Sequence, residues 1–417
     1  MLTLPFVREH ADEVRENLRR RNAEAPLDRI LELDRRSREL RTETEGLRAE
    51  RNRSSKGGRP DEKTRARLRE IGERIAAIEQ ELKPLEDELH QKLLHLPNMA
   101  DPSAPVGPDE SHDVVLRTVG QPRQLGFAAK PHWDLGERLG ILDIPRAVKL
   151  AGARFFALRG AGAALERALI AWLIDEKVRL HGFTEVYPPF LAREEVLIGS
   201  GSLPKSRGVV FKVESEDLFL VPTAEVQLLS MYRDEVLDAA TLPLRLVAYT
   251  PCFRNEQMSA GRDVLGIKRD YQFDKVEMFV FCRPEDSAAE LDRLVRLAGE
   301  PLERLGLTYR VKELATGDLA FQAAKAIDLD VWSPGVQEWL EVSSCSNCTD
   351  FQSHRANVRM RVARDGRAVP LHTLNGSALG LARTLIAVIE NYQREDGSIE
   401  VPPVLRPYLH GLEVITA

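Results

Sequence analysis

Cysteine is scarce in this chain of 417 residues, which contains only Cys252, Cys282, Cys345 and Cys348. Four scattered cysteines do not make a disulfide framework, so we expect free thiols in a reducing cytoplasm. Long apolar runs are also missing, since none approaches the ~18 residues that a membrane helix needs. The N-terminus becomes charged too early for a signal peptide. These absences predict a cytoplasmic protein without membrane contact.

Several common catalytic patterns are missing as well. The sequence contains no HExxH, GxSxG or Walker motif, so metalloprotease, α/β-hydrolase and P-loop functions have little support. Cys345-Ser-Asn-Cys348 is a lone CxxC pair without further ligands at regular spacing, and no structural zinc is expected. The net charge of −6 argues against a general nucleic-acid coat. Any basic surface must therefore be local.

What is present begins with a long N-terminal segment that is almost free of glycine and proline. Apolar or small side chains recur at alternating spacings of three and four residues over 30–47 and again over 68–89. A Gly57-Gly58-x-Pro60 break separates the two segments. This pattern predicts an antiparallel coiled-coil hairpin over about 27–95. Each helix would reach roughly 40 Å, so the hairpin is an arm rather than part of a globular core.

Charge is uneven along this arm. Ten basic but only five acidic residues fall between positions 48 and 74. Local positive charge attracts the phosphates of a nucleic acid. The candidate contacts near the tip are Arg51, Arg53, Lys56, Arg59 and Lys63. The alternative is a solvated coiled-coil surface, on which arginine and glutamate are ordinary residues.

A proline-rich stretch ending near Pro108 separates the arm from the rest of the chain. We therefore expect an N-terminal domain over 1–108, comprising the hairpin and a linker. Beyond it, helical and strand-like segments alternate over 109–417, which predicts one α+β domain.

Two strand-like runs within that domain, 247–256 and 271–281, predict an antiparallel hairpin. The period of two in a strand would place Arg254 and Glu256 on one face, and the return strand can bring Phe273 beside them. A guanidinium binds phosphate, a carboxylate accepts from an exocyclic amine, and an aromatic ring stacks on a base. Together these groups suit an ATP pocket. The alternative is a charged hairpin at a sheet edge.

Two later segments add chemistry to this hypothesis. Glu341, Ser343 and Ser344 fall on a predicted strand, where a carboxylate and a hydroxyl can hold Mg²⁺. Leu374-Asn-Gly376 predicts a turn, followed by a helix from Ser377 that carries Arg383. The alternatives are an exposed strand carboxylate and an arginine on a helix surface.

The chain resembles the bacterial-type seryl-tRNA synthetases, which are class II aminoacyl-tRNA synthetases, over essentially its whole length. Besides the arm, the resemblance rests on Leu203-Pro-Lys205, Pro222-Thr-Ala-Glu225, Thr250-Pro-Cys-Phe-Arg254-Asn-Glu256, Gly261-Arg-Asp263, Gln272-Phe-Asp-Lys-Val-Glu-Met278, Glu341-Val-Ser-Ser-Cys-Ser-Asn347, Asp350-Phe-Gln352 and Leu374-Asn-Gly-Ser-Ala-Leu379. The arm and the Thr-Ala-Glu motif together distinguish this family from other class II enzymes. The resemblance implies an antiparallel β-sheet flanked by helices.

The resemblance also implies an activity. The family uses ATP and Mg²⁺ to activate L-serine as seryl-adenylate and transfers serine to tRNA(Ser), and to tRNA(Sec) where it is present. Its arm binds the long variable arm of the tRNA across a homodimer. Residues 164–189 correspond to the segment that forms the dimer.

The family's functional residues can be placed on this sequence by their motifs. Three residues would carry the catalytic charge: Arg254, Glu341 and Arg383. The ATP contacts would be Arg254, Glu256, Arg269, Phe273, Glu341, Ser344 and Arg383, with Glu341 and Ser344 holding Mg²⁺. The serine contacts would be Thr223, Glu225, Arg254, Glu277, Asn375 and Ser377.

The chain departs from the family pattern at four positions. Leu265 and Leu340 replace arginines, Tyr271 replaces a histidine, and Gln227 stands where proline is common. Lineage drift in a working enzyme explains such changes. A paralogue that activates serine or an analogue for another acceptor, or that confers antibiotic resistance, explains them too. An inactive tRNA-binding or regulatory homologue is disfavoured because the charged site residues are retained.

Overall fold

The computed structural model describes residues 1–54, 61–256, 265–363 and 366–417. The chain divides into two compact units, one formed by 1–19 and 23–97 and the other by 20–22 and 98–417. Among the described residues the first unit is helical and the second holds every strand. No helix in this part of the chain combines the length and apolar composition needed to cross a membrane.

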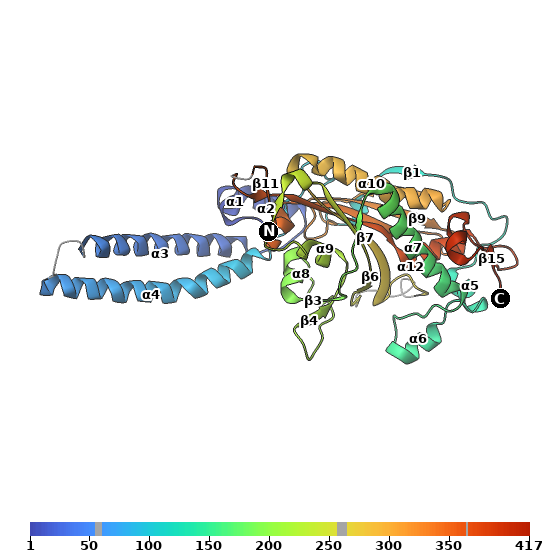
Figure 1. The fold of residues 1–417 in the computed structure, drawn as a ribbon, viewed down its shortest axis with the longest axis horizontal. Helices are drawn as coiled ribbons and strands as arrows, with labels where there is room; N and C mark the ends of the chain where they lie inside the picture. Colours follow the sequence, from blue (N-terminus) through green and yellow to red (C-terminus); the bar gives the residue numbers. More distant parts are fainter. Residues whose placement is uncertain (55–60, 257–264, 364–365) are drawn as a thin grey trace. The chain divides into compact units, whose positions relative to one another are not determined.

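The first unit contains a two-helix hairpin preceded by two short helices (Figure 1). The helices are α1 (Leu4–Glu9), α2 (Ala11–Arg20), α3 (Leu27–Ser54) and α4 (Glu62–Leu93). The buried side chains of the long helices follow the predicted spacing and include Ile30, Leu33, Ser37, Leu40, Thr44, Ile71, Ile75, Ile78 and Leu89. Thr44 Oγ1 donates to Leu40 O at 2.9 Å, which satisfies a hydroxyl within the seam. The predicted hairpin is therefore confirmed.

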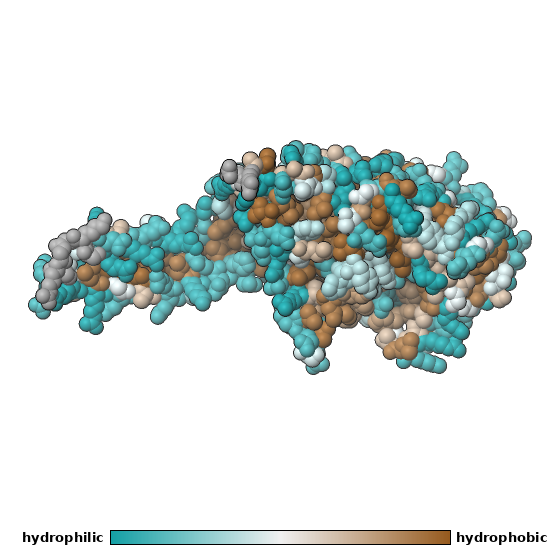
Figure 2. Space-filling view, viewed as in Figure 1, coloured by the Kyte–Doolittle hydropathy of each residue, from teal (hydrophilic) through white to brown (hydrophobic). Residues whose placement is uncertain are grey.

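A ladder of ion pairs crosses between α3 and α4. Arg41–Glu86 and Arg48–Glu79 also join the two helices. The ladder itself consists of Arg29–Glu88, Arg36–Glu81, Glu43–Arg74 and Glu50–Arg67. Successive pairs are seven residues apart on both helices, and the numbers fall on α4 as they rise on α3, as antiparallel helices require. The arginine changes from α3 to α4 at the midpoint. The side chains are exposed, and hydrophilic residues cover most of the surface of the two helices (Figure 2).

The second unit is built around an eight-stranded sheet of order β1-β8-β9-β10-β13-β7-β6-β2. The strands are β1 (Val114–Val119), β2 (Thr184–Glu185), β6 (Leu244–Phe253), β7 (Gln272–Cys282), β8 (Tyr309–Glu313), β9 (Lys325–Ser333), β10 (Glu338–Thr349) and β13 (His372–Gly380). All neighbours are antiparallel except β2 and β6, which are parallel. This sheet agrees with the predicted fold class.

The two faces of the sheet carry different helices. The helices α7 (Ala161–His181), α10 (Ser287–Arg304) and α12 (Leu381–Asn391) share a core with Val276, Met278 and Val280 of β7. Phe279 and Phe281 instead pack in a second core with α9 (Glu225–Ser230) and α11 (Phe351–Ala356). Because side chains alternate along a strand, the odd-numbered residues from 273 to 277 belong to this second face.

Smaller elements complete the unit. They are α5 (His132–Arg138), α6 (Ile144–Ala151), α8 (Glu194–Ser200), β3 (Leu191–Arg193), β4 (Leu218–Leu220), β5 (Val236–Asp238), β11 (Arg359–Arg361), β12 (Val369–Pro370), β14 (Ile399–Glu400) and β15 (Val414–Ile415). The strands β12, β11 and β5 form a second sheet, and β3–β4 and β14–β15 form two-stranded ones.

The segment expected to be a linker is hydrogen-bonded to the second unit. Asn98 N–H donates to Phe321 O at 3.0 Å, and Gly317 N–H donates to Gly107 O at 2.8 Å. Arg21 is buried there and donates to four backbone carbonyls, those of Asn98, Leu319, Ala320 and Ala323. Burial lowers the pKa of its guanidinium to about 10. Residues 20–22 and 98–107, which come before and after the hairpin in the sequence, thus belong to the second unit.

The turn predicted at Leu374–Gly376 is wrong, and the helix predicted from Ser377 begins later than expected. Residues 372–380 form β13, a central strand, and α12 begins only at Leu381. A Cβ on Gly376 would lie 2.9 Å from Cys345 Sγ on the adjacent strand. The glycine is therefore required for close packing between strands, not for a turn. Asn375 and Ser377 lie in the sheet.

The strand prediction for 247–256 is also too long. β6 ends at Phe253, and Glu256 N–H donates to Arg254 O at 3.0 Å. Arg254 and Glu256 consequently sit on a turn beyond the strand. Gly261, Arg262 and Asp263 of the following motif lie outside the described residues.

Candidate active site

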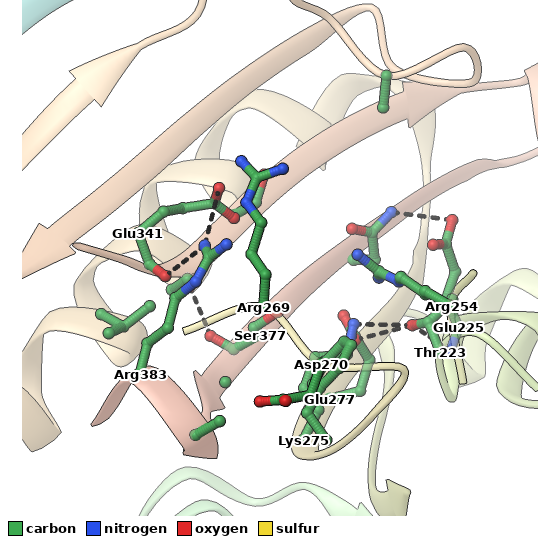
Figure 3. Close-up of a pocket in the computed structure, with 18 of the residues that line it drawn as sticks. Thr223, Glu225, Arg254, Arg269, Asp270, Lys275, Glu277, Glu341, Ser377 and Arg383 are labelled. Atoms are coloured by element: carbon green, nitrogen blue, oxygen red, sulfur yellow. Dashed lines mark hydrogen bonds and ion pairs between the residues drawn. The ribbon is translucent and has the colours of Figure 1, made fainter. Parts of the chain in front are cut away.

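A cavity of about 390 Å³ opens on the second face of the sheet. All twelve residues predicted for ATP, Mg²⁺ and serine line it: Thr223, Glu225, Arg254, Glu256, Arg269, Phe273, Glu277, Glu341, Ser344, Asn375, Ser377 and Arg383. In Figure 3, Glu341 and Arg383 lie at one end of the cavity, and Thr223, Glu225 and Glu277 lie at the other. These side chains come from separate motifs that the sheet brings together.

Arg254 is held by two contacts. Its Nε donates to Pro222 O at 3.1 Å, and its guanidinium carbon lies 5.2 Å from the centre of the Phe273 ring. Among the described residues, no carboxylate lies within ion-pair distance of it. The outer N–H groups are thus positioned by the protein but not neutralised by it, an arrangement suited to an anionic ligand.

A buried cluster of Thr223, Lys275 and Glu277 forms one end of the cavity. Lys275 Nζ pairs with Glu277 and donates to Thr223 Oγ1 at 2.8 Å. Thr223 Oγ1 donates in turn to Glu277 Oε2 at 3.0 Å. Because all three side chains are nearly inaccessible to water, Lys275 compensates a charge that would otherwise be costly to bury.

Glu225 is the second buried carboxylate at this end. Its Oε1 accepts hydrogen bonds from Gln322 at 3.3 Å, Gln352 at 2.6 Å and Asn375 at 3.1 Å. Burial raises the pKa of Glu225 to about 7, and the nearby charge of Glu277 adds to the increase. A cation entering between the two carboxylates would lower that pKa. This end of the cavity is therefore suited to an ammonium group.

The opposite end joins α12 to β10. Arg383 Nη1 donates to Glu341 O at 2.9 Å and lies 3.4 Å from Glu341 Oε2. Its Nε donates to Lys268 O at 3.3 Å. Arg269 lies 4.0 Å from Glu256. Both arginines are tethered at the rim of the cavity, where a polyphosphate can reach them.

The residues around Glu341 fit a hard divalent cation. Asp328 of β9 pairs in register with Ser344, and its Oδ1 is buried without a hydrogen-bond partner in the described structure. Burial, and then the charge of Glu341, raises the pKa of Asp328 well above its usual value. Glu341, Ser344 and Asp328 offer the oxygen ligands that Mg²⁺ prefers. Ser343 is turned away, since its Oγ donates to Ser377 O at 2.6 Å.

Sequence reasoning missed several residues at this site. Lys275 could have been found from the alternation of β7, because it lies two residues from both Phe273 and Glu277. Asp270, whose pKa burial raises to about 7, also lines the cavity. Gln322 lies in a loop before β9, and Asp328 lies on β9 opposite Ser344 of β10. The local sequence does not indicate either position.

The departures from the family pattern lie outside this cavity. Leu265 and Leu340 line a neighbouring cavity of about 380 Å³ together with Trp133, Val336 and Ile386. Lys268 borders both cavities, but its ammonium is paired with Glu338.

The other two departures are at packing positions. Tyr271 packs edge-on against Phe155 and Phe211, and Gln227 donates to Pro189 O at 2.9 Å.

The predicted tRNA contacts are only partly described. Arg51 and Arg53 lie in the last turn of α3 and Lys63 in the first turn of α4, all exposed. Lys56 and Arg59 fall outside the described residues. Four other basic residues of this half are paired with acids: Arg48–Glu79, Arg67–Glu50, Arg69–Glu73 and Arg74–Glu43.

Two family models match the chain. Residues 1–100 match the seryl-tRNA synthetase N-terminal domain, and residues 211–392 match the class II tRNA synthetase core domain of the G, H, P, S and T enzymes. The serine–tRNA ligase of Thermomicrobium roseum is 55% identical, with 100% of this chain and 95% of the relative covered. That of Chloroflexus aurantiacus is 51% identical, with both chains fully covered.

Solved structures agree with these matches. The seryl-tRNA synthetase of Pyrococcus horikoshii, complexed with ATP, superposes with a TM-score of 0.94 at 38% identity, covering 100% of this chain and 99% of the other. The cytoplasmic serine–tRNA ligase of Naegleria fowleri, in complex with AMP, has a TM-score of 0.89 at 30% identity, with the same coverage. The resemblance and the fold predicted from the motifs are confirmed: the chain belongs to the seryl-tRNA synthetase family.

Proposed function

We propose residue roles for the reaction of this family. The chain is a serine–tRNA ligase: it activates serine with ATP as seryl-adenylate, releases pyrophosphate, and transfers serine to tRNA. One observation carries the proposed roles. Twelve residues line a single cavity, ten of them from five separate motifs, with Glu225 and Glu277 at one end and Glu341 and Arg383 at the other.

Arg254 is proposed to bind the α-phosphate of ATP and the carboxylate of serine together. Its pinned Nε leaves the outer N–H groups for two anions, so the serine carboxylate can be aligned for in-line attack. Glu256 would accept from the adenine amine, Phe273 would stack on adenine, and Arg269 and Arg383 would contact the outer phosphates. This positioning and positive charge make a protein nucleophile unnecessary.

Glu341 and Ser344 are proposed to hold Mg²⁺, with Asp328 beside them. Bound there, the ion would supply positive charge to the phosphates of ATP. The support is the set of oxygen ligands that these residues offer. It includes Asp328 Oδ1, a buried carboxylate oxygen without a hydrogen-bond partner among the described residues.

Serine would occupy the opposite end. Glu225 and Glu277 suit its ammonium, and Thr223, Asn375 and Ser377 surround the space left for its hydroxyl. A pocket that hydrogen-bonds a hydroxyl rejects alanine because its own polar groups would stay buried and unpaired, by up to ~10⁴-fold.

The N-terminal domain, 1–108, is proposed to bind the long variable arm of tRNA(Ser), and tRNA(Sec) where it exists. Exposed Arg51, Arg53 and Lys63 support this, with Lys56 and Arg59 of the same basic stretch as further contacts. The catalytic domain would comprise 109–417. We further propose a cytoplasmic homodimer, as in the family, with 164–189 at its interface.

One paired assay tests these proposals. Serine-dependent ATP–pyrophosphate exchange and serylation of tRNA(Ser) should both occur, and threonine or alanine should drive little exchange. Exchange without serylation would instead indicate an enzyme with another acceptor. Loss of both would indicate an inactive homologue.

A further inference from the structure

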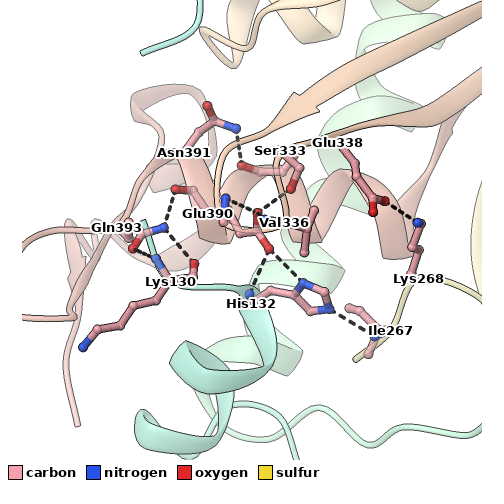
Figure 4. A network of polar contacts seen from close by, with 12 residues as sticks. Lys130, His132, Ile267, Lys268, Ser333, Val336, Glu338, Glu390, Asn391 and Gln393 are labelled. Carbon is pink, nitrogen blue, oxygen red and sulfur yellow. Dashed lines mark hydrogen bonds and ion pairs between the residues drawn. The ribbon is translucent and has the colours of Figure 1, made fainter. Parts of the chain in front are cut away.

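Glu390, near the C-terminal end of α12, is a fully buried carboxylate surrounded by donors (Figure 4). Its Oε1 accepts from His132 N–H and His132 Nδ1, both at 2.9 Å. Its Oε2 accepts from Ser333 Oγ at 2.5 Å, Gly335 N–H at 2.8 Å and Val336 N–H at 3.2 Å. Every partner is a donor, so Glu390 acts only as an acceptor.

His132, the first residue of α5, links this carboxylate to the segment that precedes β7. The ring is 1% exposed, and its Nε2 accepts from Ile267 N–H at 3.2 Å. Because Nε2 is the acceptor, the ring proton sits on Nδ1 and points to Glu390. Both ring nitrogens are therefore engaged, one with α12 and the other with the backbone of Ile267.

Two glycines allow the backbone to approach this pair closely. Gly266 has a φ of +69°, and a Cβ there would lie 1.9 Å from His132 Nε2. A Cβ on Gly335 would lie 2.8 Å from both Cδ and Oε2 of Glu390. A side chain at either position would displace the ring or the carboxylate.

The segment that His132 holds leads directly into the ATP cavity. Ile267 is followed by Lys268, whose carbonyl accepts from Arg383, and then by Arg269 and Asp270, which line the cavity. Arg383 and Glu390 are seven residues apart, about two turns of one helix. Helix α12 thus holds neighbouring residues of this segment at two points, directly through Arg383 and indirectly through His132.

We propose that His132 is a positioning residue for ATP. By joining Glu390 to Ile267, it sets the backbone from which Arg269 reaches the phosphates, although its own side chain does not line the ATP cavity. This inference rests on the proposed function of that cavity.

Replacing His132 by asparagine or by glutamine distinguishes a positioning role of the ring from a role in packing alone. In His132→Asn the amide replaces Nδ1 and can still donate to Glu390, but nothing accepts from Ile267. In His132→Gln the amide oxygen replaces Nε2 and can accept from Ile267, but the side-chain bond to Glu390 is lost. The first variant should be the more stable one, and the second should position the segment better.

The measurement is serine-dependent ATP–pyrophosphate exchange with purified full-length protein. His132→Asn should raise KM for ATP about 5–10-fold, the effect of one lost hydrogen bond, and change KM for serine less than about twofold. His132→Gln should keep KM for ATP within about twofold of the unchanged protein despite a lower unfolding temperature. Calorimetric binding of a non-hydrolysable ATP analogue, performed below the unfolding temperature, should rank the variants in the same order.

His372→Asn is the matched control. His372 Nδ1 bonds to Ser287 Oγ at 2.9 Å, which joins β13 to α10 away from both cavities. This variant should leave KM for ATP unchanged. An unchanged KM in His132→Asn, or variants that rank by stability alone, would overturn the proposal. Absence of serine-dependent exchange in the unchanged protein would instead contradict the proposed function.

Discussion

Ion pairs along the arm are exposed and repeat every seven residues, whereas Glu225, Lys275 and Glu277 at one end of the cavity are buried and follow no heptad period. Exposed pairs such as Glu43–Arg74 gain little stability because water screens them and both side chains lose entropy. In the cavity, Lys275 faces Glu277, and removing one of them leaves the other charged group buried. The ion pairs of the arm thus favour one alignment of its two helices, whereas the charged groups of the cavity are suited to binding charged ligands.

The largest expected effect concerns Arg254. Arg254→Ala should reduce serine-dependent pyrophosphate exchange by about 10³-fold, because the variant loses the group that aligns two anions. Its unfolding temperature should change little, since the side chain makes only one hydrogen bond to the protein among the described residues. Arg283→Ala is the control, because Arg283 also donates to a backbone carbonyl, that of Ala239, but lies outside the cavity. Near-normal exchange in folded Arg254→Ala would contradict its role.

The next effect compares the two regions directly. Lys275→Met should lower the free energy of unfolding by about 3–5 kcal/mol, because Glu277 loses its buried partner. Arg74→Met in the arm should lower it far less, because both side chains of the Glu43–Arg74 pair are exposed to water. Denaturant titration at pH 7 would measure both. Equal losses would show that burial does not distinguish the two kinds of pair.

A third effect concerns pH. Burial raises the pKa of Glu225 to about 7 from its ordinary 4.5, so between these values the folded state binds more protons than the unfolded state. Its contribution to stability is therefore present below about pH 4.5 and is lost as pH rises through 7, by roughly 3 kcal/mol. Unfolding measured from pH 5 to 8 should show a shallower loss in Glu225→Gln.

The same carboxyl group should make serine binding pH-dependent. A serine ammonium beside Glu225 would lower the pKa and release a proton near pH 7. Calorimetry in buffers of different ionisation enthalpy would detect this release, and Glu225→Gln should abolish it.

Substitutions at the tip of the arm should have the smallest effect on serine activation. Changing Arg51, Arg53, Lys56, Arg59 and Lys63 together to glutamine should flatten the salt dependence of tRNA(Ser) binding by about one unit of slope for each lost phosphate contact. Serine-dependent exchange should not change. An unaltered salt slope would leave the arm tip as a solvated surface.

The same contrast explains what could be predicted from the sequence. The hairpin follows from a local period, and its buried residues from Ile30 to Leu89 match that period. The site residues were predicted because motifs with a family resemblance carried them, not because spacing alone brought them together. Asn375–Gly376 was wrongly predicted as a turn. The glycine is needed there because a side chain would collide with Cys345 on the adjacent strand. Asp328 and Arg21 likewise depend on partners distant in sequence.

The change of sign at the midpoint of the ladder makes misalignment of the hairpin detectable. A slip of one heptad would oppose Arg36 to Arg74 in one direction and Glu43 to Glu81 in the other, although the apolar seam would still match. A ladder with all arginines on one helix would accept either slip without repulsion. The four exposed pairs, individually weak, thus distinguish the native alignment from its nearest competitors. The arm can therefore recover the same alignment of its two helices after unfolding.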